Sequence, residues 1–188
     1  LDLGAFAAEG AQVMARSLRS QGSGRAGFTL MPPSETGLTW TNSLPPTLYA
    51  QRQNLMNGSG VALGDFDGDG WCDIYLCNKE GPNALYRNLG QWRFEDVTAR
   101  AGVACADQLS FGTVFADINS DGHLDLLVSS FTGSGACFLN LGDGAFTNVT
   151  DRSGLMLGNG TTSLALGDVD GDGDLDVYVC RFGVEALL

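Results

Sequence analysis

Three short stretches of the chain place acidic side chains at alternate positions, in a pattern that can hold a metal ion. Each stretch has an oxygen-bearing side chain at positions 1, 3, 5 and 9 and a glycine at position 6. Like charges packed this closely repel one another unless a cation lies among them, and alternate carboxylates around a sharp turn suit a hard ion such as calcium. The stretches are residues 65–73, 117–125 and 168–176, which start 52 and 51 residues apart.

The spacing predicts one calcium ion in each loop. Side-chain oxygens at positions 1, 3, 5 and 9 are the expected ligands, and position 7 is expected to contribute its backbone carbonyl. Because a carbonyl needs no particular side chain, position 7 can be tryptophan, histidine or aspartate. The predicted ligands are Asp65, Asp67, Asp69, Trp71, Asp73, Asp117, Asn119, Asp121, His123, Asp125, Asp168, Asp170, Asp172, Asp174 and Asp176.

Other metal chemistries fit the loops less well. An EF-hand needs a bidentate glutamate at position 12, where this chain has Leu76, Val128 and Val179. Magnesium prefers a strict octahedron that few all-protein cages provide. A catalytic metal is also disfavoured, because equivalent loops in every repeat indicate structural reinforcement and no general base stands beside them. His123, the single histidine, is expected to be an ordinary exposed side chain.

The elements that position these loops repeat with them. Residues 84–98 match residues 136–150 at an offset of 52, and residues 28–38 match the end of the same pattern more weakly. Each repeat is typical of four short strands with turns between them, which in the first repeat are residues 61–64, 73–77, 83–88 and 92–97. A period of this length with four strands per unit predicts an all-β fold of β-propeller-like blades, each an antiparallel sheet.

We divide the chain into two parts. Residues 1–27 form an N-terminal segment, with a short helix expected over residues 5–18 and a flexible linker after it. Residues 28–188 hold about three repeats, and the last of them is partial. The units are residues 28–103, 104–155 and 156–188. Propellers of this kind usually close with about seven blades, so we expect an open propeller or part of a longer one. Its open blade edges favour self-association.

The composition excludes several classes of protein. The net charge is −12, and 11 of the 22 acidic residues occupy the ligand positions of the three loops. Nucleic acid is not expected as a partner, because phosphate binding needs a basic surface and no basic stripe is present. No apolar run is long enough to span a membrane. No signal-peptide pattern is visible in the chain.

Cysteines and glycosylation sequons add two weaker signals. Cys77 and Cys180 occupy the same repeat position and are expected to be small buried residues at strand ends. The five cysteines form no CxxC pair. One disulfide among them is possible, but the sequence does not identify its partners. Three sequons begin at Asn57, Asn148 and Asn159, and they matter only if the chain is secreted by a glycosylating host.

The Asp-x-Asp-x-Asp-Gly-x-x-Asp loops between strands resemble FG-GAP or VCBS repeats, the blades of the integrin α-chain propeller. The further pattern Asn-Leu-Gly, Phe-Glu-Asp-Val-Thr and Ala-Gly-Val, within residues 88–103, resembles the ASPIC/UnbV type of repeat protein. The resemblance covers about residues 28–182. It implies calcium-binding blades, an extracellular or secreted location and a role in adhesion or matrix. The Phe-Gly pair itself is present at Phe111-Gly112.

Three functions compete at this point. The first is a non-enzymatic calcium-stabilised module that binds a protein or glycan ligand. The second is a structural subunit, in which blades of neighbouring copies stack into a filament or ring. The third is a carbohydrate-active propeller enzyme, which needs paired acids or a base outside the loops. The glutamates are scattered and suggest no such pair, at Glu9, Glu35, Glu80, Glu95 and Glu185.

Overall fold

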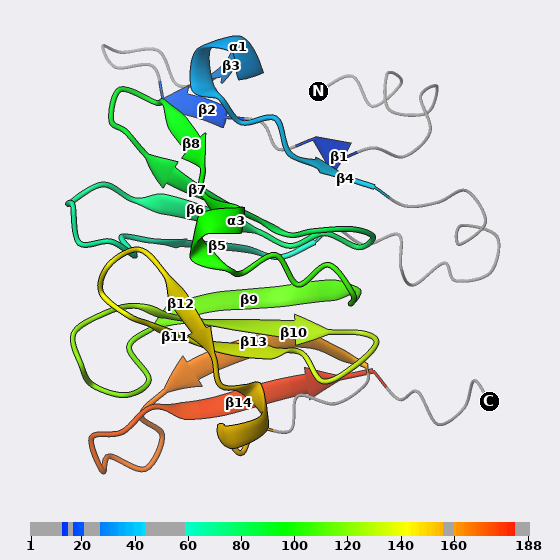
Figure 1. The fold of residues 1–188 in the computed structure, drawn as a ribbon, viewed down its shortest axis with the longest axis vertical. Helices are drawn as coiled ribbons and strands as arrows, with labels where there is room; N and C mark the ends of the chain where they lie inside the picture. Colours follow the sequence, from blue (N-terminus) through cyan, green and yellow to red (C-terminus); the bar gives the residue numbers. More distant parts are fainter. Residues whose placement is uncertain (1–12, 15–16, 21–26, 44–58, 156–159, 183–188) are drawn as a thin grey trace, which may run out of the picture.

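Two four-stranded antiparallel sheets form the centre of the structure (Figure 1). This computed structural model describes residues 13–14, 17–20, 27–43, 59–155 and 160–182. The first sheet consists of β5 (Val61–Gly64), β6 (Asp73–Leu76), β7 (Ala84–Asn88) and β8 (Phe94–Asp96). The second consists of β9 (Ser110–Ala116), β10 (Asp125–Ser130), β11 (Ala136–Asn140) and β12 (Phe146–Asn148).

In both sheets the strands lie side by side in chain order, with each pair antiparallel. The chain is therefore all-β with propeller-like blades, as predicted, and the described strands form no closed barrel. A third sheet pairs β13 (Thr161–Gly167) with β14 (Asp176–Arg181). The three sheets follow one another along the longest axis of the molecule (Figure 1). We call them blades one, two and three.

The fourth strand of blade one begins two residues later than predicted. Gln91 and Trp92 have φ angles of 53° and 65°, in the left-handed region that non-glycine residues rarely adopt. The turn after Asn88 is therefore longer than expected. It closes with a bond from the Leu89 N–H to the Arg93 carbonyl, 2.7 Å long.

A single helical turn follows each complete blade, and the sequence did not predict it. Helix α3 (Thr98–Ala101) ends at Gly102, whose φ is 77°, and the 3-10 helix η3 (Thr150–Arg152) occupies the equivalent place in blade two. Helix α1 (Pro33–Thr36) ends in the same way at Gly37, whose φ is 78°. Residues 28–38 therefore share the local structure of residues 94–103, as their weaker match predicted.

The N-terminal segment differs from the prediction. In place of a helix over residues 5–18, the described part forms β1 (Val13–Met14) and β2 (Ser17–Ser20). These strands are extended because they pair with β4 (Thr41–Asn42) and β3 (Phe28–Met31). The rest of the expected helix lies outside the described residues. The pairing of β2 with β3 also crosses the boundary drawn at residue 27.

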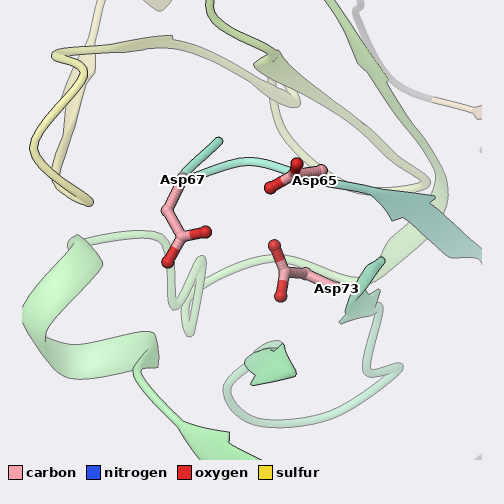
Figure 2. Close-up of side chains that lie close together, drawn as sticks. All are labelled: Asp65, Asp67 and Asp73. Atoms are coloured by element: carbon pink, nitrogen blue, oxygen red, sulfur yellow. The ribbon is translucent and has the colours of Figure 1, made fainter. Parts of the chain in front are cut away.

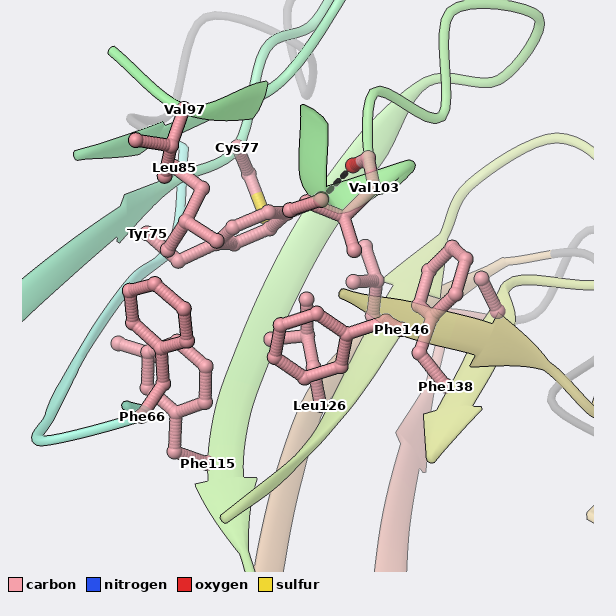
Figure 3. Packing of buried hydrophobic residues seen from close by; sticks show 14 residues of the cluster. Phe66, Tyr75, Cys77, Leu85, Val97, Val103, Phe115, Leu126, Phe138 and Phe146 are labelled. Atoms are coloured by element: carbon pink, nitrogen blue, oxygen red, sulfur yellow. Dashed lines mark hydrogen bonds between the residues drawn. The ribbon is translucent and has the colours of Figure 1, made fainter. Parts of the chain in front are cut away.

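The main core lies between blades one and two (Figure 3). In β6, Tyr75 faces blade two, whereas Ile74 and Leu76 pack with Leu38 on the opposite face. Strand β10 alternates in the same way, with Leu126 toward blade one and Leu127 toward blade three. Because both faces of the middle strands are covered, their sequences are apolar without a polar alternate.

Two glycines let the first strands of neighbouring blades approach closely. A side chain at Gly60 would collide with the carbonyl of Phe111, which accepts a hydrogen bond from the Gly60 N–H. One repeat later, a Cβ at Gly112 would lie 3.1 Å from the Cα of Ser163 in blade three. The glycine of the Phe-Gly position is therefore required by contact between blades.

Within the described residues, no helix is long and apolar enough to cross a membrane.

Candidate metal sites in the blade loops

The acidic loops join the first and second strands of each blade, and in each of them the aspartate at position 1 accepts two backbone N–H groups. In the first loop, both oxygens of Asp65 accept backbone N–H groups, from Asp69 at 3.0 Å and Gly70 at 2.8 Å. Asp117 accepts the equivalent bonds from Asp121 and Gly122 in the second loop. In the third loop, Asp168 accepts from Gly171 and Gly173.

The aspartate at position 9 anchors each loop. Asp73 Oδ2 accepts the Phe66 N–H at 3.0 Å, and Asp125 and Asp176 accept the equivalent bonds from position 2 of their loops. Asp73 and Asp125 are fully buried, whereas Asp176 is exposed. Burial raises the pKa of Asp73 to about 6 and also raises the pKa of Asp125. A cation in the loop would offset this cost of a buried carboxylate.

Carboxylates converge in two of the loops. Ligand oxygens of Asp65, Asp67 and Asp73 lie within 4.8 Å of one another, and the three side chains turn toward a common point (Figure 2). Asp168, Asp170 and Asp176 form the equivalent cluster in the third loop. Oxygen-only donors at this separation fit a hard divalent ion. These two acidic clusters can therefore bind a metal.

The second loop lacks such a cluster among the described acidic residues, because Asn119 replaces the carboxylate at position 3. Its amide Nδ2 donates to Asp121 Oδ2 at 2.8 Å, so a neutral amide stands where the other two loops have a carboxylate. Backbone and side-chain donors also lower the pKa of the exposed Asp121, with the His123 N–H as the largest cause. Asn119 keeps an amide oxygen that can serve as a ligand.

A basic residue reaches the first loop, and the sequence analysis missed it. Arg87 Nη2 donates to Asp69 Oδ2 at 2.8 Å, and Nε forms an ion pair with Asp67 Oδ2 at 2.5 Å without hydrogen-bond geometry. The bond to Asp69 raises the pKa of Arg87. The equivalent residue in blade two is Leu139. No repeated pattern marks Arg87, because the two repeats differ there.

The side chains at position 7 are exposed, and two of them cover a turn. The ring of Trp71 lies 3.3 Å from the position that a Cβ of Gly90 would occupy. The ring of His123 packs against Gly142 in the equivalent way in blade two. His123 is therefore exposed, as expected, and contacts its own blade. Asp174, at the same position of the third loop, is exposed. Whether the carbonyls at position 7 bind an ion stays a prediction.

Two asparagines connect the loops to the third strands. The Asn88 N–H donates to Asp73 Oδ1 at 2.7 Å, and the Asn140 N–H donates to Asp125 Oδ1 at 2.8 Å. Each side-chain amide also donates to the carbonyl at position 8 of its own loop, that of Cys72 or Leu124. The Asn-Leu-Gly motif predicted only a hairpin turn here. Its recurrence at an offset of 52 residues was the signal that Asn88 and Asn140 share a structural role.

The remaining predicted residues have mixed outcomes. Cys77 is buried at the end of β6, as expected, whereas Cys180 is exposed on β14. All five cysteines are described, and they form no disulfide with one another. Asn148 is exposed, and its Oδ1 accepts both donors of Thr150, the third residue of its sequon. Asn57 and Asn159 lie outside the described residues, so glycosylation stays a prediction.

Comparison with known proteins supports the resemblance. A family model described as an FG-GAP-like repeat matches residues 65–128 and 117–179, which together cover more than half of the chain. Each match begins at position 1 of a metal loop and ends in the second strand of the next blade. The family repeat thus coincides with the period of the loops.

Curated relatives are cartilage acidic protein 1 of Xenopus tropicalis, at 31% identity, of Homo sapiens, at 28%, and of Mus musculus, at 31%. Each match covers 124 residues, or 64% of this chain and 19% of the relative. The chain therefore spans about a fifth of the length of these relatives. The repeated loops, the blades and the family match together show that the chain belongs to the FG-GAP-like repeat family.

Proposed function

We propose that the chain is a calcium-binding repeat module of the ASPIC/UnbV type, located outside the cell, that serves adhesion or matrix interaction and is not an enzyme. The observation that carries the proposal is the convergence of Asp65, Asp67 and Asp73 within 4.8 Å, with Asp73 buried. Asp65, Asp67, Asp69 and Asp73, with the Trp71 carbonyl, would hold the ion in the first loop.

Calcium fits this donor set better than magnesium. All donors are protein oxygens on one flexible turn, and calcium accepts six to eight such ligands in variable geometry. A bound ion would neutralise the loop and hold the first two strands of the blade together. Extracellular calcium modules bind with a Kd of about 10⁻⁴ to 10⁻³ M. The extracellular location is supported by the relatives named for cartilage.

The non-enzymatic role is supported by what the acidic groups contact. The loop carboxylates accept backbone N–H groups of their own loop and so shape the turn. A hollow of about 590 Å³ holds Glu95, Asp96 and Arg100. Asp96 Oδ1 there accepts both donors of Thr98, the first residue of α3, and so fixes the start of that helix. This hollow therefore does not present an acid and a base paired for catalysis.

Calcium binding can be measured directly by isothermal titration of chelator-treated protein with CaCl₂, with MgCl₂ as the competing ion. We expect saturable calcium binding that millimolar magnesium weakens little. Chelation should also lower the melting temperature, because an ion at 100 times its Kd stabilises the folded state by about 2.7 kcal/mol. A titration without heat, together with a melt that excess EGTA leaves unchanged, would contradict the calcium assignment.

A second proposal concerns self-association, and the exposed face of blade three supports it. Tyr178 is 73% exposed, although its equivalents Tyr75 and Leu127 are fully buried against the next blade. Val169 is 77% exposed, whereas its equivalent Phe66 is 2% exposed. We propose that a blade of a second copy covers this face. Because its residues occupy the repeat positions that take the next blade elsewhere in the chain, a blade of a second copy is the fitting occupant.

Sedimentation over a range of concentrations tests this second proposal. We expect concentration-dependent association that Tyr178→Glu abolishes. Asp107→Lys also changes the charge of an exposed residue, but in the connection between α3 and β9, and should not alter association. A strict monomer at all concentrations would contradict the proposal.

A further inference from the structure

The first metal loop is part of the interface between blades one and two. Phe66 stands at position 2 of the loop, between the ligands Asp65 and Asp67, and its side chain is only 2% exposed. Its ring packs against Phe146 on β12 of blade two, with ring centroids 5.8 Å apart (Figure 3). A residue inside one blade's metal loop therefore fills the core shared with the next blade.

The peptide of Phe66 is also held from both blades. On its own side, the Phe66 N–H donates to Asp73 Oδ2, the buried ligand of the same loop, at 3.0 Å. From the other side, Asn140 Nδ2 of blade two donates to the Phe66 carbonyl at 2.7 Å. Asn140 is 3% exposed, so this hydrogen bond is made away from water. Losing a buried partner leaves the carbonyl unsatisfied, which makes the bond expensive to break.

Asn140 at the same time holds the second loop by two hydrogen bonds. Its N–H donates to Asp125 Oδ1 and its Nδ2 donates to the Leu124 carbonyl. One side chain thus contacts position 2 of the first loop and position 8 of the second. Asn88 makes the equivalent contacts within blade one, to Asp73 and Cys72.

We propose that Asn140 and Phe146 couple the first metal loop to the docking of blade two, so that an ion in the first loop tightens the interface and the interface tightens the loop. This proposal rests on the proposed calcium site. Asn140 is a positioning residue: it is not a predicted ligand of the first loop and acts on that loop through the Phe66 peptide.

The coupling follows from geometry. An ion drawn to Asp65, Asp67 and Asp73 fixes the backbone between positions 1 and 3, and with it the Phe66 carbonyl and ring. The Phe66 carbonyl then meets Asn140, and the Phe66 ring meets Phe146 in the arrangement of Figure 3. Without the ion, the repelling carboxylates favour a more open loop, which would pull Phe66 from blade two. Coupling between two equilibria is reciprocal, so each site must report on the other.

Trp71 provides a probe for the first loop alone. It lies at position 7, where the other loops have His123 and Asp174. Terbium replaces calcium at oxygen sites, and its emission under tryptophan excitation requires a nearby indole. Terbium emission sensitised by Trp71, and its displacement by calcium, therefore measure occupancy of the first loop. Trp71→Phe identifies the emission that belongs to this site.

We expect Asn140→Ala to weaken terbium and calcium binding in the first loop about twofold to fivefold, part of what one buried hydrogen bond contributes. Phe146→Leu should act in the same direction through the ring contact, without touching the amide. Asn148→Ala is the matched control: it is an exposed asparagine of the same blade, and its side chain contacts Thr150. Its titration should equal that of the wild type.

The reverse direction is measured by hydrogen–deuterium exchange. Asp67→Asn removes the charge of a first-loop ligand and so weakens that site, and with calcium present it should increase deuterium uptake in residues 136–148 of blade two. Asp107→Asn, which removes the same charge from an exposed position outside the loops, should leave that uptake unchanged.

The outcomes separate the two proposals. Absence of sensitised emission and of calcium competition in the wild type would overturn the proposed metal site and the coupling with it. Normal binding in the wild type, with unchanged affinity in both folded variants Asn140→Ala and Phe146→Leu, would overturn the coupling alone. Should Asn140→Ala fail to fold, as its melting curve shows, Phe146→Leu and the exchange measurement decide the question.

Discussion

Arg87 Nε lies 2.5 Å from Asp67 Oδ2, so a cationic side chain from β7 reaches the first acidic loop. The same guanidinium holds Asp69 Oδ2 at 2.8 Å. Asp67 and Asp69 are predicted ligands, and a bound ion must share these carboxylates with Arg87 or displace it. Among the described blades only the first has this pair, because blade two carries Leu139 at the equivalent position.

Arg87→Leu should strengthen calcium binding in the first loop. Removing the positive charge frees two carboxylates for the ion, and we expect about a fivefold gain in affinity, equivalent to ~1 kcal/mol. Because the Arg87 side chain is 33% exposed, salt screens the effect, and the gain should shrink at high ionic strength. Competition of calcium with Trp71-sensitised terbium measures it.

The matched control for this change is Arg93→Leu. Arg93 is an exposed arginine of the same hairpin and makes no ion pair with a described residue. Its replacement should leave the affinity within error of the wild type. Equal affinity in Arg87→Leu at low salt would show that the guanidinium does not compete with the ion.

Asn119→Asp should make the second loop a stronger site. It restores the carboxylate that the other loops carry at position 3, and affinity in such loops rises with the number of ligand charges. We expect calcium to bind about tenfold more tightly there, with lower stability in excess chelator because of added repulsion. Isothermal titration and paired melting curves measure both effects. A variant that is more stable without calcium would contradict this account.

Lys79→Met should change how stability depends on pH. Lys79 is fully buried over the Phe111 ring, its Nζ has no hydrogen-bond partner among the described residues, and burial lowers its pKa to about 7. An unfolded lysine titrates near pH ~10.4. Between these values the unfolded chain binds more protons. The contribution of Lys79 to the stability of the wild type should therefore rise with pH from about 7 to 10, by at most ~1.4 kcal/mol per pH unit.

Methionine removes this titration while keeping the length of the side chain. The variant should be more stable than the wild type at pH 7, and the difference should narrow as the pH rises. Urea unfolding at several pH values between about 7 and 10 measures it. A difference that stays constant across this range would show that Lys79 keeps an ordinary pKa in the folded protein.

Gly60→Ala should destabilise the contact between blades one and two. The added methyl group would collide with the Phe111 carbonyl, which is backbone and cannot rotate away. We expect a loss of about 1–3 kcal/mol in the free energy of unfolding. Gly167→Ala is the control, because a Cβ there meets no atom within 4 Å. It should change stability by about 0.5 kcal/mol or less. Equal effects would contradict the steric account.

The local structure of the repeats was predictable from the sequence. Alternate aspartates around a glycine define a turn whose hydrogen bonds join residues at most seven apart, such as Phe66 and Asp73. Apolar strands with turn residues between them define the hairpins of a blade, and the repeat period gives the number of blades. These features depend on neighbours in the chain, so their spacing alone specifies them.

Contacts between distant residues were decided by the tertiary structure, either between blades or between strands of one blade. Asn140 and Phe66 are 74 residues apart, and Arg87 lies 18 residues from Asp69, on a different strand. Nothing in the spacing of either pair indicates a contact. Likewise, the equivalent cysteines Cys77 and Cys180 differ in burial because a blade covers one and leaves the other exposed.

The sequence by itself determined the loops, their donor oxygens and the four-stranded unit that carries them. The tertiary structure decided which loop has a rival cation, which carboxylates are buried and which loop takes part in an interface. The physical reason is that ligand spacing is a short-range property of the backbone. Burial and electrostatic environment instead arise only when strands far apart in the chain come together, within a blade as Arg87 reaches Asp69 or between blades as Phe66 packs on Phe146.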